Sequence, residues 1–333
     1  MKKLKFLLVH QNFPGQFRQL APYLHEKGHE VVGICSHKRP YPGKFRLFRY
    51  QSPENPPEGL PHSSQLANEV IQRAASVAKI CEQLKGECWS PDLICAHSGW
   101  GESLAIKEVW ENVPQVIWPE LWLRPEHSGW GLDPQKPRPG LPQYLEHVGR
   151  NTFTRAALSQ ADAWVVPTLH QANSFPKEFR SERMHIVHEG IDTTFASPNP
   201  LVNLEIRGKK LTRKTPIITF VNRHLERLRG FDTFMRSLPE VLSRNKQVQV
   251  LIVGDNEGGY GGGHPSGKSL KEVLLEELKG QLDLERIHFL GRIPHPSLIA
   301  LFQISSVHVY LSYPFVLGWS LLEAMACGCC IIA

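Results

Sequence analysis

The sequence predicts an α/β protein made of two doubly wound, Rossmann-like domains that face each other across a cleft. Short, nearly continuous apolar segments recur along the chain, such as KFLLV (5–9) and VQVLIV (248–253), which is typical of strands covered on both faces. Helical patterns separate them, and the order strand, helix, strand implies parallel sheets. The alternation is interrupted over residues 197–215 and then restarts. We therefore expect an N-terminal domain over 1–196, a linker over 197–215 and a C-terminal domain over 216–333.

Length and composition agree with two globular domains. The 333 residues exceed what one hydrophobic core usually covers, and 41% apolar with 21% charged residues is ordinary for a soluble protein. The formal net charge of +6 favours anionic ligands or anionic membrane surfaces. Nucleic acid is not expected as a partner, because the basic residues follow no RRM, zinc-finger or basic-helix pattern.

The start of the chain and its cysteines bear on localisation. The basic and apolar start MKKLKFLLV stops at His10, which is too short for a signal peptide, so we interpret it as a first buried strand. No segment approaches the roughly 18 apolar residues of a membrane-spanning helix. The seven cysteines form no pair of CxxC motifs, which favours reduced thiols in a cytoplasmic protein. We expect a cytoplasmic location and leave peripheral association with the inner face of the membrane open.

In the first domain, the apolar segments predict strands at 5–9, 30–34, 92–96, 115–118, 163–166 and 185–188. A helix is expected after the first strand, because Phe17, Leu20, Ala21 and Leu24 follow the i, i+3, i+4, i+7 spacing and Gly28 ends the pattern. The proline-rich segment 134–143 predicts an irregular loop.

The interval 197–215 is polar and positively charged without a clean period, so it is expected to be a linker or an exposed hairpin. In the second domain we expect strands at 217–221, 248–253, 286–291, 307–311 and 329–333, with helices at 230–244, 269–279, 296–303 and 320–327. The glycine-rich segment 256–268 predicts a flexible loop, because it lacks the strand, GxGxxG, helix context of a phosphate cradle. A sixth strand and closing helices are absent, so we expect a second domain that is incomplete at its C-terminus, as a fragment or a truncated protein.

Ligands of open α/β sheets bind beyond the carboxyl ends of the strands, so residues just after strands are the candidates. Arg223 follows the strand at 217–221, and Arg229 lies six positions later, beside Gly230 at the next helix. Two guanidinium groups near a helix N-terminus would bind a diphosphate and stabilise it as a leaving group. The alternative is a solvated loop with Glu226 as the partner.

The segment SLLEAMACG begins a helix whose first turn offers N–H groups to a phosphate, and Glu323 lies one turn inside it. A carboxylate there can accept hydrogen bonds from a ribose diol, although it could equally complement the helix dipole. Leu321 and Leu322 belong to this candidate site by position, while their side chains, with that of Met325, are expected to pack in the core.

In the first domain, Gly15 separates the first strand from the first helix and could let a phosphate or sugar approach the backbone, or could be an ordinary turn glycine. His97 follows the strand at 92–96 on the same edge and could be catalytic or structural. Four tryptophans could stack on sugar faces or pack in the core: Trp100, Trp118, Trp122 and Trp130.

Several motifs together resemble family 4 of the glycosyltransferases, which have the GT-B fold. These are LLEAMACG at a helix start, two cations after the linker, HIVHEGIDTTF before it, and IHFLGRIP between them. The resemblance implies retaining transfer of a sugar from a nucleotide diphosphate sugar, with no cofactor and no required metal, to a glycan or lipid-linked acceptor of the cell envelope. It implies the following roles: Arg223 and Arg229 for the diphosphate, Glu323 for the ribose, Gly15 for the phosphate side of the first domain, His97 for the transferred sugar or reacting centre, and the backbone of Ile293 for the base.

The chain departs from the family pattern in two residues. The first of two family glutamates falls at Phe315, so its contact with the donor sugar would pass to backbone groups around Val316 and Leu317, up to Trp319, or be lost. The second cation is commonly Lys and here is Arg229, which can still bind phosphate. A non-catalytic nucleotide-sugar binding protein is therefore the main alternative. A nicotinamide-dependent oxidoreductase is disfavoured because the first strand leads into HQNFPGQF, with one glycine and no GxGxxG.

Overall fold

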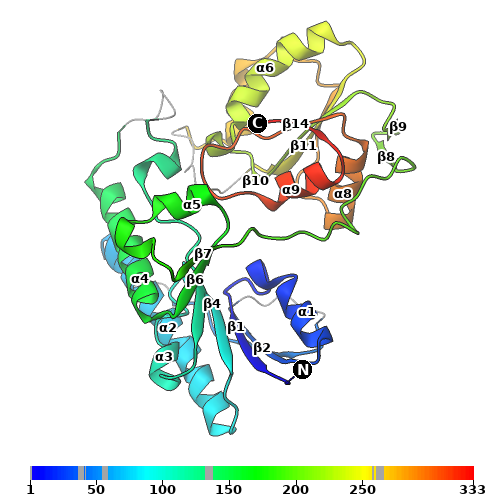
Figure 1. The fold of residues 1–333 in the computed structure, drawn as a ribbon. Helices are drawn as coiled ribbons and strands as arrows, with labels where there is room; N and C mark the ends of the chain where they lie inside the picture. Colours follow the sequence, from blue (N-terminus) through cyan, green and yellow to red (C-terminus); the bar gives the residue numbers. More distant parts are fainter. Residues whose placement is uncertain are drawn as a thin grey trace. The chain divides into compact units, whose positions relative to one another are not determined.

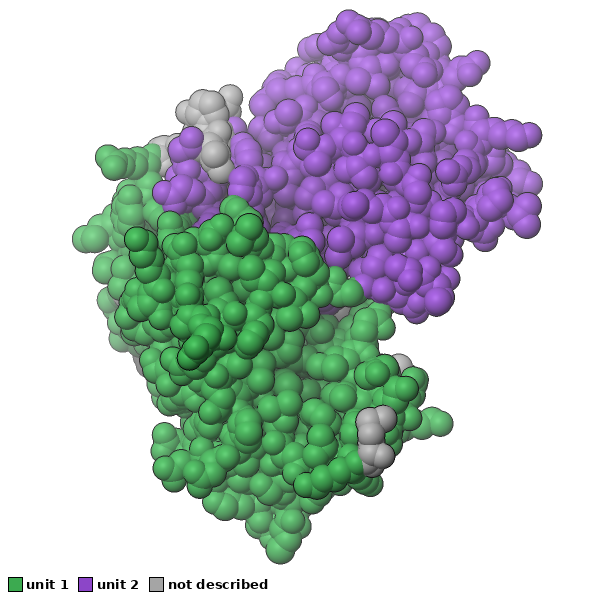
Figure 2. Space-filling view, viewed as in Figure 1, with its two compact units in different colours: residues 1–125, 137–190 green, residues 126–136, 191–333 purple. Residues whose placement is uncertain are grey.

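A computed structural model describes residues 2–36, 41, 43–54, 59–131, 138–256, 259 and 266–333 (Figure 1). The chain divides into two compact units, one formed by Met1–Pro125 and Pro137–Gly190 and the other by Glu126–Lys136 and Ile191–Ala333 (Figure 2). Residues 134–137 of the loop expected at 134–143, and most of the segment 256–268, lie outside the described residues. The prediction of an irregular loop is wrong for residues 141–143, because a helix begins at Leu141 and Pro142 fits its first turn.

Unit 1 contains a seven-stranded parallel sheet in the order β3-β2-β1-β4-β5-β6-β7. The strands are β1 (Lys5–Val9), β2 (Glu30–Cys35), β3 (Arg46–Arg49), β4 (Leu93–His97), β5 (Gln115–Trp118), β6 (Ala163–Val166) and β7 (Met184–Ile186). The helices are α1 (Leu20–Glu26), α2 (His62–Gly86), α3 (Ile106–Val109), α4 (Leu141–Gln160) and α5 (Leu169–Ser174). Six of the strands confirm the sequence prediction.

The core of unit 1 lies on both faces of this sheet. On β1, Leu7 and Val9 belong to one buried cluster, and Phe6 and Leu8 belong to another. Successive side chains of a strand point to opposite faces, so a strand buried on both sides must be apolar at every position. This is why the first segment is continuously hydrophobic.

Unit 2 contains a five-stranded parallel sheet in the order β12-β11-β10-β13-β14. Its strands are β10 (Ile217–His224), β11 (Gln249–Asp255), β12 (Ile287–Phe289), β13 (Val307–Val309) and β14 (Cys330–Ile332), and its helices are α6 (Phe231–Arg244), α7 (Leu270–Glu277), α8 (His295–Ile304) and α9 (Trp319–Ala326). All nine elements were expected from the sequence. The interval expected as a linker or hairpin contains the antiparallel pair β8 (Asn203–Ile206) and β9 (Lys209–Thr212).

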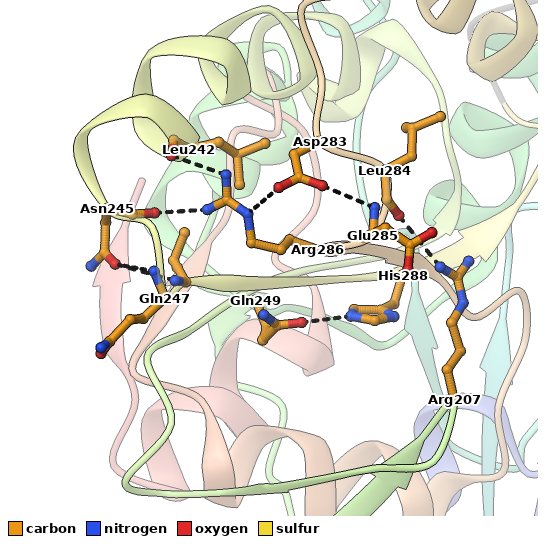
Figure 3. Close-up of polar contacts among 11 residues, drawn as sticks. Arg207, Leu242, Asn245, Gln247, Gln249, Asp283, Leu284, Glu285, Arg286 and His288 are labelled. Atoms are coloured by element: carbon orange, nitrogen blue, oxygen red, sulfur yellow. Dashed lines mark hydrogen bonds and ion pairs between the residues drawn. The ribbon is translucent and has the colours of Figure 1, made fainter.

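One polar cluster lies at the amino ends of β11 and β12 (Figure 3). The guanidinium group of Arg286 donates to the carbonyl oxygens of Leu242 (3.1 Å) and Asn245 (2.8 Å) and to Asp283 Oδ2 (2.6 Å). The two carbonyls lie at the C-terminus of α6, where backbone acceptors need partners and the helix dipole favours a cation. This cluster lies at the sheet edge opposite the carboxyl ends, so it supports the fold and leaves the other edge for ligands.

The strand order defines where those ligands would bind. In unit 1 the chain passes from β1 to β2 on one side of β1 and later places β4 on the other side of β1. The direction in which strands are added to the sheet therefore reverses at β1. In unit 2 the same reversal occurs between β10 and its neighbour β13. In open α/β sheets the loops at such a reversal separate and leave a crevice at the carboxyl edge.

A buried histidine in unit 2 makes stability depend on pH. His308 of β13 is fully buried, and its Nδ1 lies 3.0 Å from Thr219 Oγ1 on β10. Burial lowers the pKa of His308 to about 4, below the roughly 6.5 of an unfolded histidine. Below pH 6.5, His308 therefore becomes protonated in the unfolded chain but stays neutral in the folded chain. The free energy of unfolding falls as the pH falls towards 4.

We expect the free energy of unfolding of unit 2 to fall by about 3 kcal/mol between pH 7 and pH 4 from this group alone. His308→Phe should remove that part of the pH dependence, which urea denaturation at several pH values would measure. Equal pH dependence in the wild type and His308→Phe would contradict the assignment.

Candidate functional site

At the reversal in unit 1, Gly15 lies against His10. Gly15 has a φ of +47°, and a Cβ at this position would collide with the imidazole ring of His10. Both facts require glycine here. The space beside Gly15 is therefore filled by the chain's own side chain, and the approach of a sugar or phosphate to this backbone stays a prediction.

His97 is the last residue of β4 and lies at the same reversal. It is 3% exposed, and its ring centroid lies 4.8 Å from that of His10. The Nδ1 atom accepts the N–H of Gly99 (3.2 Å), while Nε2 lies 3.6 Å from Glu120 Oε1. This geometry places the ring proton on Nε2, facing a carboxylate.

The carboxylate of Glu120 opposes the effect of burial on the pKa of His97. Burial lowers the pKa of His97, but the charge of Glu120 opposes it, and the net shift is upward. For Glu120, burial raises the pKa, and the charges of His97 and His10 reverse this, so the net shift is downward. The Glu120 side chain is 36% exposed.

Glu120 was not expected from the sequence. It comes two residues after β5, and its Oε1 accepts a hydrogen bond from Gln16 Nε2 in the turn that contains Gly15. The strand-end rule that selected His97 also selects Glu120 when it is applied to β5. Two of the four candidate tryptophans have ring contacts consistent with packing: Trp118 lies edge-on to Phe17, and Trp122 stacks on Phe179.

In unit 2 the two predicted arginines lie in different environments. Arg223 is near the end of β10, is exposed, and pairs with no carboxylate in the part of the chain that the structure describes. Arg229 is largely buried, donates from Nη1 to Ser312 Oγ (3.2 Å), and has Nε 3.8 Å from Glu226 Oε1. Among the described residues, Glu226 therefore pairs with Arg229, as the alternative interpretation expected, and does not pair with Arg223.

The loop after β10 and the loop after β13 touch at the reversal in unit 2. Gly230 has a φ of +69°, and a Cβ there would collide with Leu311. The N–H of Tyr313 donates to the carbonyl oxygen of Leu228 (2.9 Å). The segments that the sequence assigned to the diphosphate and to the donor sugar are thus joined into one surface of unit 2.

Phe315 takes part in this junction. Its ring centroid lies 5.8 Å from the guanidinium carbon of Arg229, a cation–π contact. A carboxylate at this position, as in the family pattern, would pair with Arg229 and reduce its attraction for an anion. The aromatic ring of Phe315 does not neutralise Arg229, so the guanidinium charge can still attract an anionic ligand.

Glu323 is 7% exposed and lies in α9. Its Oε1 lies 2.7 Å from Nε2 of His295, the first residue of α8. Ile293 comes two residues before His295 and packs, half-buried, against the core. The residue predicted to contact the base therefore lies just before α8, whose first residue is bound to the predicted ribose residue Glu323. His295 was not expected from the sequence.

The remaining candidates lie around the start of α9. The segment that includes Val316 and Leu317 is irregular, and the side chains of Leu321 and Leu322 are half-buried. Met325 was expected in the core, but its side chain is 57% exposed. The prediction for Met325 is wrong because this face of α9 is not covered by the described part of unit 2.

Each of the two units contains a parallel sheet with a strand reversal, as the two-domain fold predicted from the motifs requires. Residues 27–196 match the family described as "Glycosyl transferase family 4 group", and residues 202–333 match "Glycosyl transferases group 1". The chain belongs to family 4, group 1, of the glycosyltransferases.

Known proteins place the chain within this family. It is 25% identical over 291 residues to D-inositol 3-phosphate glycosyltransferase of Corynebacterium jeikeium, covering 84% of this chain and 63% of the relative. It is 27% identical over 194 residues to the enzyme of the same name from Nocardia farcinica, covering 56% of this chain and 41% of the relative. The chain thus spans less than two thirds of either relative's length.

A solved structure confirms the fold. Sucrose-phosphate synthase from Thermosynechococcus elongatus superimposes with a TM-score of 0.66 at 17% identity, covering 99% of this chain and 81% of that protein. The described part of the chain contains no helix with both the length and the hydrophobicity of a membrane span.

Proposed function

We propose that this protein is a retaining glycosyltransferase that moves a sugar from a nucleotide diphosphate sugar to an acceptor. The observation that carries the proposal is the surface at the reversal in unit 2, where the cation Arg229 lies on the loop next to α6 and touches the loop after β13. Arg223 is exposed near the carboxyl end of β10, the strand that precedes this loop, and adds a second positive charge. Such a surface suits a diphosphate better than a neutral ligand.

The leaving group of this reaction is a nucleoside diphosphate, whose charge grows as the glycosidic bond breaks. We propose that Arg223 and Arg229 stabilise that charge, so that the transfer needs no metal ion. Glu323 would accept hydrogen bonds from the ribose, and the backbone of Ile293 would contact the base. His97 would contact the transferred sugar.

We propose a cell-envelope or exported glycan, or a lipid-linked sugar, as the acceptor, with the protein in the cytoplasm or at the inner face of the membrane. The name of the curated relatives supports a second candidate, a phosphorylated cyclitol such as inositol phosphate. Both acceptors present hydroxyl groups to the same donor, so donor specificity and acceptor specificity can be tested separately.

The test is a calorimetric panel of UDP-, GDP- and ADP-sugars, followed by transfer assays with the donor that binds. Acceptors would be inositol 3-phosphate and a polyprenyl-linked sugar, each with and without EDTA. We expect saturable binding of one nucleotide class, and product with the anomeric configuration of the donor by NMR. Binding without transfer to any acceptor would favour a non-catalytic nucleotide-sugar binding protein, and an inverted product would refute the retaining mechanism.

A further inference from the structure

Glu120 occupies a backbone conformation that side chains rarely adopt. Its φ is +54°, and the N–H of Leu121 donates to the carbonyl oxygen of Pro119 (2.7 Å), which closes a three-residue turn around Glu120. Turns of this kind with a positive central φ are rare and strained. Strained positions of this type concentrate at functional sites.

The other described non-glycine residues with positive φ have ordinary explanations. Cys88 follows the last turn of α2, where helices often end in a left-handed residue. Arg207 precedes Gly208 in the two-residue turn of the β8–β9 hairpin, which requires positive φ at both positions. Glu120 caps no helix and closes no hairpin, so its conformation needs another reason.

Surrounding groups hold Glu120 in place at two points. The buried Gln171 of α5 donates from Nε2 to the Glu120 carbonyl oxygen (3.0 Å). Gln171 is itself held by Thr168, the N-cap of α5, whose Oγ1 accepts the Gln171 N–H (3.1 Å). Gln16 donates to the Glu120 carboxylate. The main chain and the side chain are both fixed, which is how a strained residue persists in a folded protein.

The carboxylate held in this way faces one functional atom, Nε2 of His97. We propose that Glu120 is a positioning residue for His97: it keeps the ring proton on Nε2 and holds the imidazole ring in its orientation when the transferred sugar is bound. This inference rests on the proposed function, in which His97 contacts that sugar. The backbone strain is retained because a relaxed backbone at residue 120 would turn the carboxylate away from His97.

Other charged groups also act on His97. Glu102 lies in the segment after β4, Glu189 follows β7, and His10 follows β1. Glu102 is fully buried, and its Oε1 is bound to the hydroxyl group of Tyr50 (2.6 Å). Glu120 is the carboxylate placed against Nε2 itself, so its removal should have the largest effect on the ring.

The strain is tested by two substitutions that both remove the carboxylate. Alanine keeps the steric cost of positive φ, and glycine does not. We expect Glu120→Gly to melt about 2–4 °C above Glu120→Ala. At the exposed Glu111, which lies in a turn and has no positive φ, the same pair should show the usual order, with alanine equal to or above glycine.

The positioning role is tested on the same variants. Both Glu120→Ala and Glu120→Gly should lose turnover about tenfold or more, with the donor Kd changed less than about threefold, while Glu120→Asp should recover part of the turnover. In 15N-histidine NMR, His97 should carry its proton on Nε2 in the wild type. Its pKa should fall in Glu120→Ala, because the opposing carboxylate is gone.

The outcomes separate this inference from the proposed function. If the wild type transfers no sugar, the proposed function fails, and the melting order and the His97 resonances still decide the role of Glu120. An unchanged His97 tautomer and pKa in Glu120→Ala would overturn the positioning role. Alanine melting above glycine at residue 120 would overturn the claim that strain is retained there.

Discussion

Replacing Arg229 with alanine is expected to weaken binding of the nucleotide diphosphate donor by roughly 10- to 100-fold. A charge-assisted hydrogen bond to phosphate contributes about 1.5–3 kcal/mol, which corresponds to that range. The loss should exceed that of Arg223→Ala, because Arg229 also lies 3.8 Å from the largely buried carboxylate of Glu226. Without the cation, this carboxylate repels the diphosphate more strongly.

A double variant distinguishes the loss of this charge from a general loss of folding. Adding Glu226→Gln to Arg229→Ala should restore part of the donor affinity, measured by calorimetry, because it removes the repulsion. Arg244→Ala is the matched control: this arginine is 78% exposed on α6 and pairs with Glu240 on the same helix. If the wild type, Arg223→Ala and Arg229→Ala all bind the donor with equal affinity, the assignment of these two arginines to the diphosphate is wrong.

The fold was largely predictable from the sequence because the strands are buried on both faces. Leu7, Val9 and their neighbours on β1 leave a continuous apolar signal that only a covered sheet explains. The strand β3 (Arg46–Arg49) was missed for the opposite reason. It lies at the sheet edge and is only partly buried, so its sequence RLFR lacks that signal.

The candidate site was predictable only where one residue carries its own signal. Arg223 lies near the carboxyl end of β10 and Arg229 follows it as a second cation, and sequence alone predicts an anion site there. His295 and Glu120 act through a partner far along the chain, Glu323 and His97 respectively. Such pairs depend on tertiary packing. Glu120 did carry a local signal, its place just after β5, whereas His295 at the start of α8 carried none.

The second large effect is expected at His97, which should be needed for turnover more than for donor binding. His97 is buried at the reversal of unit 1, and its Nε2 is oriented by the carboxylate of Glu120. A positioned donor that stabilises charge in the transition state contributes about 10²–10³ to kcat. We therefore expect His97→Ala to lower kcat by roughly that factor, with the donor Kd changed only a few-fold.

His97→Gln separates chemistry from packing, because it keeps an N–H donor and most of the side-chain volume. It should recover more turnover than His97→Ala if the donor matters, and both variants should melt close to each other if packing is similar. The comparison uses kcat from initial rates and Kd from calorimetry with the intact nucleotide sugar in the absence of acceptor. A large rise in Kd with kcat unchanged would make His97 a binding residue, and the histidine–glutamate pair would then position the donor and take no part in the transfer.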